Sequence, residues 1–132
     1  VKPNIVPTAN YFAKLQKFDS SFYLLSWGTP TSDALFTLQY TLRTRGGENS
    51  GNGDGNYGRY SNPALDALLD KARSENDLKK RDGLLRDAQL IINREMPVLP
   101  LHQAIIPWAM KKNITAVFPP NSVPYFFRFR ID

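Results

Sequence analysis

The 132 residues, 42% hydrophobic and 22% charged, suffice for one compact domain with the composition of an ordinary globular protein. No apolar run approaches the roughly 18 residues that a membrane-spanning helix needs, and the lack of cysteine excludes disulfides, thiol catalysis and thiolate metal sites. The net charge of +5 admits a nucleic-acid partner, but the basic residues are scattered and interleaved with acids, as on solvated helix faces.

The N-terminal third predicts a strand, a helix and a second strand. Residues 1–7 have an extended pattern, and Thr8 is a candidate N-cap for a helix that carries Tyr11, Phe12, Leu15 and Phe18 on one face. The nearly continuous apolar run Phe22–Trp27 predicts a short strand buried on both faces of a sheet. Such a unit is usually parallel with a right-handed crossover. Because the chain opens at Val1 in this pattern, without a leader peptide, we expect it to be part of a longer protein.

A turn at residues 28–32 precedes a second predicted helix, which Ser32 or Asp33 can cap and which carries Leu35, Leu38 and Leu42. The stretch Gly46–Gly58 holds six of the eight glycines. Its composition cannot bury enough surface to offset the entropy of ordering, so we expect a mobile loop.

Two further helices are predicted to form a hairpin. Asn62-Pro63 is a strong helix start, and a second start at Asn76-Asp77 leads into a helix that must end before Pro97. Apolar stripes on both predict a packed seam with charged outer faces. Residues 98–110 and the tail after them have extended patterns. The fold class is therefore predicted as α/β with a helical hairpin.

The sequence contains no recognised catalytic motif. There is no Gly-x-Ser-x-Gly element, no phosphate-binding glycine loop with its lysine, and only one histidine, which by itself excludes histidine-rich metal sites. We therefore predict no enzyme activity, no cofactor and no metal. Ligands of open α/β sheets bind just beyond the carboxyl ends of strands, which directs attention to the turn after Trp27. The predicted ligand-binding residues are Trp27, Gly28, Thr29, Ser32, Asp33, His102 and Trp108.

Five segments, in order, resemble one known family. The most specific is Gly58-Arg59-Tyr60-Ser61-Asn62-Pro63-Ala64-Leu65-Asp66-Ala67-Leu68-Leu69-Asp70-Lys71-Ala72, which is similar to the Tyr-Ser-Asn-Pro-x-x-Asp-x-Leu-Leu segment of the extracellular solute-binding family 5. That family includes oligopeptide, dipeptide, nickel and glutathione binding proteins of bacterial ABC importers. The other segments are Phe18-Asp19 to Trp27-Gly28, Lys80-Arg81 to Ala88-Gln89, Met96-Pro97-Val98-Leu99-Pro100-Leu101-His102, and Trp108-Ala109-Met110-Lys111-Lys112-Asn113-Ile114.

The resemblance implies a periplasmic binding component with the type II binding-protein fold, whose two lobes close on a solute and then dock on membrane permease subunits. Residues 1–112 would be the later half of the second large lobe, and residues 113–132 the segment that returns toward the first lobe. As a C-terminal portion, the chain would expose lobe surfaces, so we expect self-association or a swapped terminal segment, and no solute binding by this piece alone.

At one position the sequence differs from the pattern of the family, and this difference leaves the identity of the solute undetermined. In many peptide binders of the family, an aspartate three residues beyond the tryptophan pairs with the peptide amino terminus, whereas Pro30 stands there in this chain. Asp33 is the first carboxylate available, and it is also a candidate helix cap. This departure disfavours a peptide with a free α-amino group and leaves modified peptides, opines, sugars and metal chelates open. The alternative function is a basic α/β module that binds nucleic acid or a protein partner.

Overall fold

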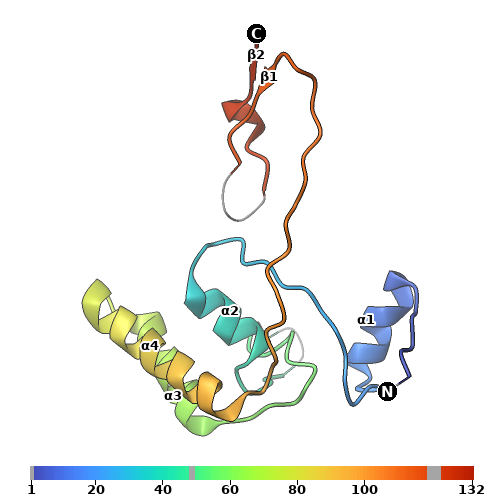
Figure 1. The fold of residues 1–132 in the computed structure, drawn as a ribbon. Helices are drawn as coiled ribbons and strands as arrows, with labels where there is room; N and C mark the ends of the chain where they lie inside the picture. The colour runs from blue at the N-terminus through green and yellow to red at the C-terminus, as the bar shows by residue number, and fades with distance from the viewer. Residues whose placement is uncertain (1, 48–49, 119–122) are drawn as a thin grey trace.

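The computed structural model describes residues 2–47, 50–118 and 123–132 (Figure 1). Within these ranges the elements are α1 (Thr8–Gln16), α2 (Ala34–Thr41), α3 (Pro63–Ser74), α4 (Leu78–Glu95), β1 (Ile114–Thr115), the 3-10 helix η1 (Phe126–Arg128) and β2 (Arg130–Ile131). The architecture is thus mixed but rich in helix. None of the helices in this part of the chain combines the length and apolar character needed to cross a bilayer.

The predicted helical hairpin is confirmed and carries the core. Asn62 caps α3 by accepting from the backbone N–H groups of Ala64 and Leu65, and Asp77 caps α4 through Lys79 and Lys80. The helix α4 ends at Glu95, and Met96 follows in the left-handed conformation (φ 48°). The buried residues that join α2, α3 and α4 are Leu38, Leu42, Leu65, Leu69, Ala72, Leu85 and Ala88.

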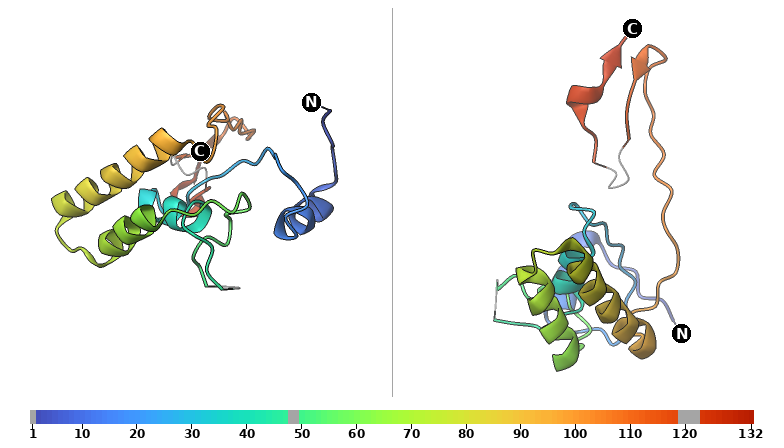
Figure 2. Two further views of the ribbon diagram at one scale, coloured as in Figure 1. Left: turned by 90° about the horizontal axis from the view of Figure 1, so that it is seen from below. Right: turned by 90° about the vertical axis from the view of Figure 1, so that its left-hand side faces the viewer.

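The helix α1 and the C-terminal part lie away from this core. Figures 1 and 2 show α1 beside the α2–α4 group, and a long extended connection that leads from α4 to the β1–β2 pair. That pair is antiparallel, with Ile114 opposite Ile131 and Thr115 opposite Arg130. Thr8 is the first residue of α1 rather than its cap, because Pro7 occupies the N-cap position without a side-chain hydrogen bond.

The predicted buried strand Phe22–Trp27 is wrong for this structure. The segment is extended but forms no ladder, and the side chains of Phe22 and Leu24 are 83% and 70% exposed. A strand is buried on both faces only when neighbouring strands and covering helices flank it. The described residues supply neither, so the parallel strand–helix–strand unit predicted for residues 1–27 is absent from them.

The described part of the glycine-rich loop makes specific contacts with the end of α2. Residues 48 and 49 lie outside the described ranges, but Gly53 and Gly55 donate backbone hydrogen bonds to the carbonyl oxygens of Gln39 and Tyr40 at the end of α2, at 2.9 and 3.0 Å. Gly53 adopts φ 66°, and an added Cβ would collide with the backbone of Arg43 and Arg45. Glycine thus lets the loop approach the helix end closely.

Asn56 is the polar centre of this packing. It is only 2% exposed, its side-chain amide donates to the carbonyl oxygens of Arg43 (2.9 Å) and Tyr60 (2.7 Å), and its Oδ1 accepts from the Tyr60 N–H at 3.1 Å. The loop therefore buries a residue whose hydrogen bonds replace missing secondary structure.

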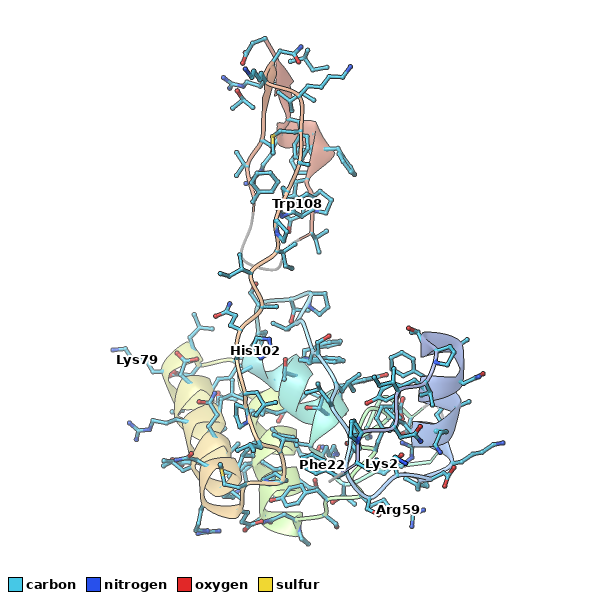
Figure 3. All side chains as sticks on the ribbon, turned by 45° about the vertical axis from the view of Figure 1, so that its right-hand side comes forward. Lys2, Phe22, Arg59, Lys79, His102 and Trp108 are labelled. Carbon is cyan, nitrogen blue, oxygen red and sulfur yellow. The ribbon has the colours of Figure 1, made fainter. Side chains whose placement is uncertain are left out.

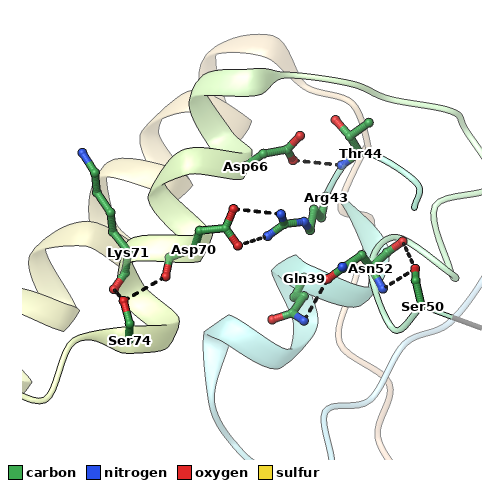
Figure 4. Close-up of polar contacts among 9 residues, drawn as sticks. All are labelled: Gln39, Arg43, Thr44, Ser50, Asn52, Asp66, Asp70, Lys71 and Ser74. Atoms are coloured by element: carbon green, nitrogen blue, oxygen red, sulfur yellow. Dashed lines mark hydrogen bonds and ion pairs between the residues drawn. The ribbon is translucent and has the colours of Figure 1, made fainter. Parts of the chain in front are cut away.

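Polar contacts also link the end of α2 to α3 (Figure 4). The Arg43 guanidinium donates two hydrogen bonds to the Asp70 carboxylate, at 2.7 and 2.9 Å, and Asp66 accepts from the Thr44 N–H at 2.9 Å. Gln39 donates to Asn52 at 3.1 Å, which ties the loop to α2. Together these contacts fix the position of α2, which follows the turn that holds five of the predicted ligand-binding residues.

Candidate functional site

The Trp27 indole lies across one face of α2. It stacks on Phe36 (centroids 6.0 Å apart, planes 20° apart) and on Tyr40 (5.0 Å, 18°). Phe36 and Tyr40 are four residues apart, which places both rings on the same side of the helix, and their planes differ by only 6°. The indole therefore covers two parallel rings in offset stacking, the preferred arrangement of aromatic pairs.

A hydrogen bond fixes the orientation of this indole. Its Nε1–H donates to Thr37 Oγ1 on α2 at 3.0 Å, so its polar group has a partner. Trp27 is nevertheless 42% exposed. The indole is therefore fixed in orientation while part of its surface is open to solvent. This exposed part could stack against a planar or apolar group of a ligand.

The turn after Trp27 offers small polar groups. The hydroxyl groups of Thr29 and Thr31 lie 3.3 Å apart, and Thr31 Oγ1 also accepts from the Asp33 N–H at 3.3 Å. Ser32 is exposed and has φ 56°, an unusual backbone conformation for a residue other than glycine. Gly28 is exposed as well, with open space where a side chain would begin. Backbone and hydroxyl groups of this turn are thus accessible for hydrogen bonding.

Asp33 has two partners in the structure. Its Oδ1 accepts from the Leu35 N–H at 2.9 Å, which caps α2, and its Oδ2 pairs with Arg81 Nη2 on α4 at 2.7 Å. Burial by itself would raise the pKa of Asp33, but the hydrogen bonds from Leu35 and Arg81 outweigh it and the pKa is lowered. Asp33 is therefore a charged structural link between α2 and α4, with both oxygens engaged.

An open depression of about 440 Å³ lies at this link. Two aspartates and two arginines line it, so its charges balance rather than favour an ion of either sign. Its lining residues are Ser32, Asp33, Ala34, Arg81, Asp82, Leu85, Arg86 and Gln89. Among the residues that the structure describes, no three His, Cys, Asp or Glu side chains are grouped as a metal ion would require.

The seven predicted residues separate into two groups. Trp27, Gly28, Thr29, Ser32 and Asp33 are consecutive or nearly so in the segment before α2, where Asp33 caps the helix and Trp27 packs along it. His102 and Trp108 both lie on the extended connection, where Figure 3 labels them well apart. His102 is exposed, whereas Trp108 packs on Phe118 with ring centroids 5.0 Å apart. Phe118 in turn contacts Phe129, so Trp108 joins an aromatic cluster with the C-terminal part.

Sequence reasoning did not identify four residues that position this site: Phe36, Thr37, Tyr40 and Arg81. The apolar helical spacing directed attention to Leu35, Leu38 and Leu42, which face the core side of α2. The spacing of Phe36 and Tyr40, four positions apart on a predicted helix that follows Trp27, was the pattern from which the stack could have been predicted. Nothing in the local sequence predicted the pairing of Asp33 with Arg81, 48 positions later.

Comparison with known proteins gives a consistent result. No family model matches the sequence. The chain is 29% identical over 118 residues to the oligopeptide-binding protein OppA of Bacillus subtilis (strain 168), which covers 89% of this chain and 20% of OppA. It is 30% identical over 107 residues to the peptide transport periplasmic protein SapA of Salmonella typhimurium (strain LT2), covering 80% of this chain and 19% of SapA.

A third relative is named for a different ligand. The probable deoxycholate-binding periplasmic protein YgiS of Escherichia coli (strain K12) is 34% identical over 77 residues, 58% of this chain and 13% of YgiS. The chain thus spans about a fifth, or less, of the length of the relatives it matches. The motif order and these similarities agree: over most of its length the chain is similar to a part of periplasmic peptide-binding and related binding proteins.

Proposed function

We propose that this chain forms part of the periplasmic solute-binding component of an ABC importer, and that it supplies one wall of the solute site. In this proposal residues 1–112 belong to the second large lobe of a type II binding protein, and residues 113–132 lead back toward the first lobe. The two lobes close on the solute by a shift in a hinge equilibrium, and the closed form docks on the permease subunits. The chain breaks no bond in the solute.

The held indole of Trp27 is the observation that carries this proposal. Its ring is fixed by Phe36, Thr37 and Tyr40 and remains 42% exposed, directly before a turn with accessible polar groups. An apolar surface beside a few well-placed polar groups is the usual composition of a small-molecule site. The similarity to OppA and SapA supports a peptide or a peptide-like solute.

Both carboxylate oxygens of Asp33 already have partners, and this limits the charge of a solute that can bind beside it. Within the turn of residues 28–33, Asp33 is the carboxylate, and its oxygens already hold the Leu35 N–H and Arg81. A cationic amine that bound here would have to compete with both partners. A solute that presents an uncharged or blocked amino end to this turn fits the proposal better than a free peptide amine.

The experiment uses the natural gene product that contains this sequence. We expect isothermal titration with di-, tri- and oligopeptides, each with free and acetylated amino ends, to detect saturable binding. The Trp27→Ala variant should weaken that binding at least tenfold, whereas Phe126→Ala, which removes an aromatic ring that is 73% exposed elsewhere, should not. The 132-residue chain alone should not bind, because the proposed site needs both lobes. Equal affinity in Trp27→Ala and the parent would contradict this assignment.

A further inference from the structure

Two dipeptides of the glycine-rich loop have a sequence that readily forms a cyclic imide. Asn52-Gly53 and Asp54-Gly55 each place a glycine, which has no side chain to hinder attack, after an Asn or Asp side chain. At Asn52 the glycine nitrogen gives its proton to hydroxide and attacks Cγ, so that an N–Cγ bond forms. The Cγ–Nδ2 bond breaks, and the leaving group takes a proton from water and departs as ammonia, which restores the hydroxide. At Asp54 the protonated carboxyl group loses water instead.

The fold requires glycine at both positions. Gly53 has φ 66°, and an added Cβ would lie 2.5 Å from the carbonyl oxygen of Arg43 and 2.8 Å from the Cα atom of Arg45. An added Cβ on Gly55 would collide with the Tyr40 ring. A larger residue would slow imide formation by hindering the attack, but it does not fit at either position. The close approach of the loop to α2 therefore retains both reactive dipeptides.

The end of α2 engages the nucleophile of each dipeptide. The last carbonyl groups of a helix have no partner within the helix, and here those of Gln39 and Tyr40 accept from the N–H groups of Gly53 and Gly55, at 2.9 and 3.0 Å. Both glycines are buried. A buried, hydrogen-bonded N–H group reaches hydroxide only when the local structure opens. The Asn52 side chain is held as well, because its Oδ1 accepts from Gln39 Nε2 at 3.1 Å.

We propose that Asn52 is a modification site that is gated by the docking of residues 51–56 on α2, and that Asp54 is a second such site. When the loop leaves α2, the imide forms, and water opens it to aspartate or isoaspartate. Isoaspartate routes the main chain through Cβ, so the Gly53 N–H no longer meets the Gln39 carbonyl group in the same register. The modified loop therefore does not return to its docked position.

The hydrogen bonds that suppress the reaction lie within this chain, so any further residues packed over the loop would add to the protection. The natural gene product that contains this sequence, held at mildly alkaline pH with and without guanidinium chloride, tests the proposal. Peptide mapping by mass spectrometry detects the replacement of the Asn52 amide by a carboxylate, and chromatography of the same peptides separates isoaspartate from aspartate at 52 and 54.

We expect modification at Asn52 to be at least about tenfold slower in the folded protein than in the unfolded one, because it has to wait for the loop to open. Asn62 measures the background, since Pro63 follows it and has no N–H group that could react. Equal rates at Asn52 in the folded and unfolded protein would overturn the proposal.

One variant separates protection by the loop contacts from protection by folding in general. Asn56→Ala removes hydrogen bonds that hold the loop, and it alters neither dipeptide. It should raise the rate at Asn52 in the folded protein about fivefold or more. The Asp82-Gly83 dipeptide lies inside α4 and should keep the parent's rate, and Asn93→Ala on α4 should leave every rate unchanged. If Asn56→Ala retains the circular dichroism of the folded parent and the rate at Asn52 is unchanged, or rises no more than that at Asp82, docking on α2 is not the gate.

Hydrogen exchange of the unmodified parent gives a reading that needs no variant. The amide protons of Gly53 and Gly55 should exchange at least about tenfold more slowly than in the unfolded protein, because both donate to carbonyl groups of α2. Exchange of both protons at the unfolded rate would show that α2 does not hold the loop and would contradict the proposal.

Discussion

The guanidinium of Arg81 on α4 lies 2.7 Å from the carboxylate of Asp33, the residue that caps α2. The first turn of α2, which follows the Trp27 turn, is thereby fixed to the helical hairpin. One aspartate thus serves both as a helix cap and as an ion-pair partner. The two contributions are separable by substitution.

We predict that Asp33→Ala lowers the free energy of unfolding by about 1 kcal/mol, because the N-cap is lost. Asp33→Asn retains a capping oxygen and should lower it by only a few tenths, since the carboxylate is 37% exposed and a partly exposed ion pair contributes about 0–1 kcal/mol. Urea unfolding of both variants, with Arg81→Gln and the Asp33→Asn/Arg81→Gln double variant, checks this. Strict additivity of the single substitutions would contradict a coupled pair.

Stability should fall in acid through two aspartates. The hydrogen bonds from Arg43 lower the pKa of Asp70, and those from Leu35 and Arg81 lower the pKa of Asp33 in spite of its burial. Because both groups have a lower pKa in the folded chain than the ordinary value of 3.8, their contribution is present above that value and is lost as pH falls through the folded pKa values.

Urea midpoints measured between pH 5.5 and pH 2.5 test this dependence. Asp70→Asn should show a smaller decrease over the range than the parent, whereas Asp82→Asn, an exposed aspartate of α4, should show a decrease equal to that of the parent. If the urea midpoint of the parent chain rose as the pH fell, this prediction would be contradicted.

Substitution of Asn56 should be the most damaging polar change in the loop. Asn56→Ala leaves the Arg43 and Tyr60 carbonyl groups and the Tyr60 N–H without their partner, at a cost of about 1–3 kcal/mol. Asn56→Asp should cost more, because it places a carboxylate against two carbonyl oxygens. Asn93→Asp, at an exposed position of α4, is the matched control. Thermal unfolding that ranks Asn56→Asp with this control would show that the loop does not need the amide.

The indole position should respond to a change in the glycine-rich loop. A Cβ added to Gly55 would collide with the Tyr40 ring, on which Trp27 stacks. In a Trp108→Phe background, which leaves Trp27 as the tryptophan, Gly55→Ala should shift the fluorescence spectrum and weaken the near-ultraviolet circular dichroism. Gly47→Ala, where a Cβ meets open space, should leave both signals unchanged. Identical spectra for Gly55→Ala and the parent would argue against the packing of Tyr40 beneath Trp27.

Local sequence patterns predicted the elements that local interactions stabilise. Asn62, Asp77 and Asp33 cap their helices as the sequence indicated, because a cap depends on residues only two or three positions away. Phe22–Trp27 was predicted as a buried strand from its apolar content, but burial depends on neighbours that a local pattern does not contain.

The ligand-binding role of the candidate site stays a prediction, and the packing around it was predicted only in part, for the same reason. Trp27 and the turn after it were identified from their place at the end of an apolar run, while the stacking by Phe36 and Tyr40 needed the path of the chain around α2. The loop was expected to be mobile from its glycine content, yet glycine is what lets Gly53 and Gly55 reach the end of α2. The glycine-rich composition indicated that ordering the loop costs much conformational entropy, but it did not reveal the hydrogen bonds that offset this cost.

The central claim is that this sequence belongs to a component that carries a solute to an ABC importer. Native mass spectrometry of the natural gene product, purified from its host without unfolding, tests it most directly. We predict a bound species of low mass, peptide or peptide-like, that is released on denaturation and is lost or reduced in the Trp27→Ala variant. A protein that carries no small molecule, and that instead binds duplex or single-stranded nucleic acid with a steep dependence on salt, would contradict the account.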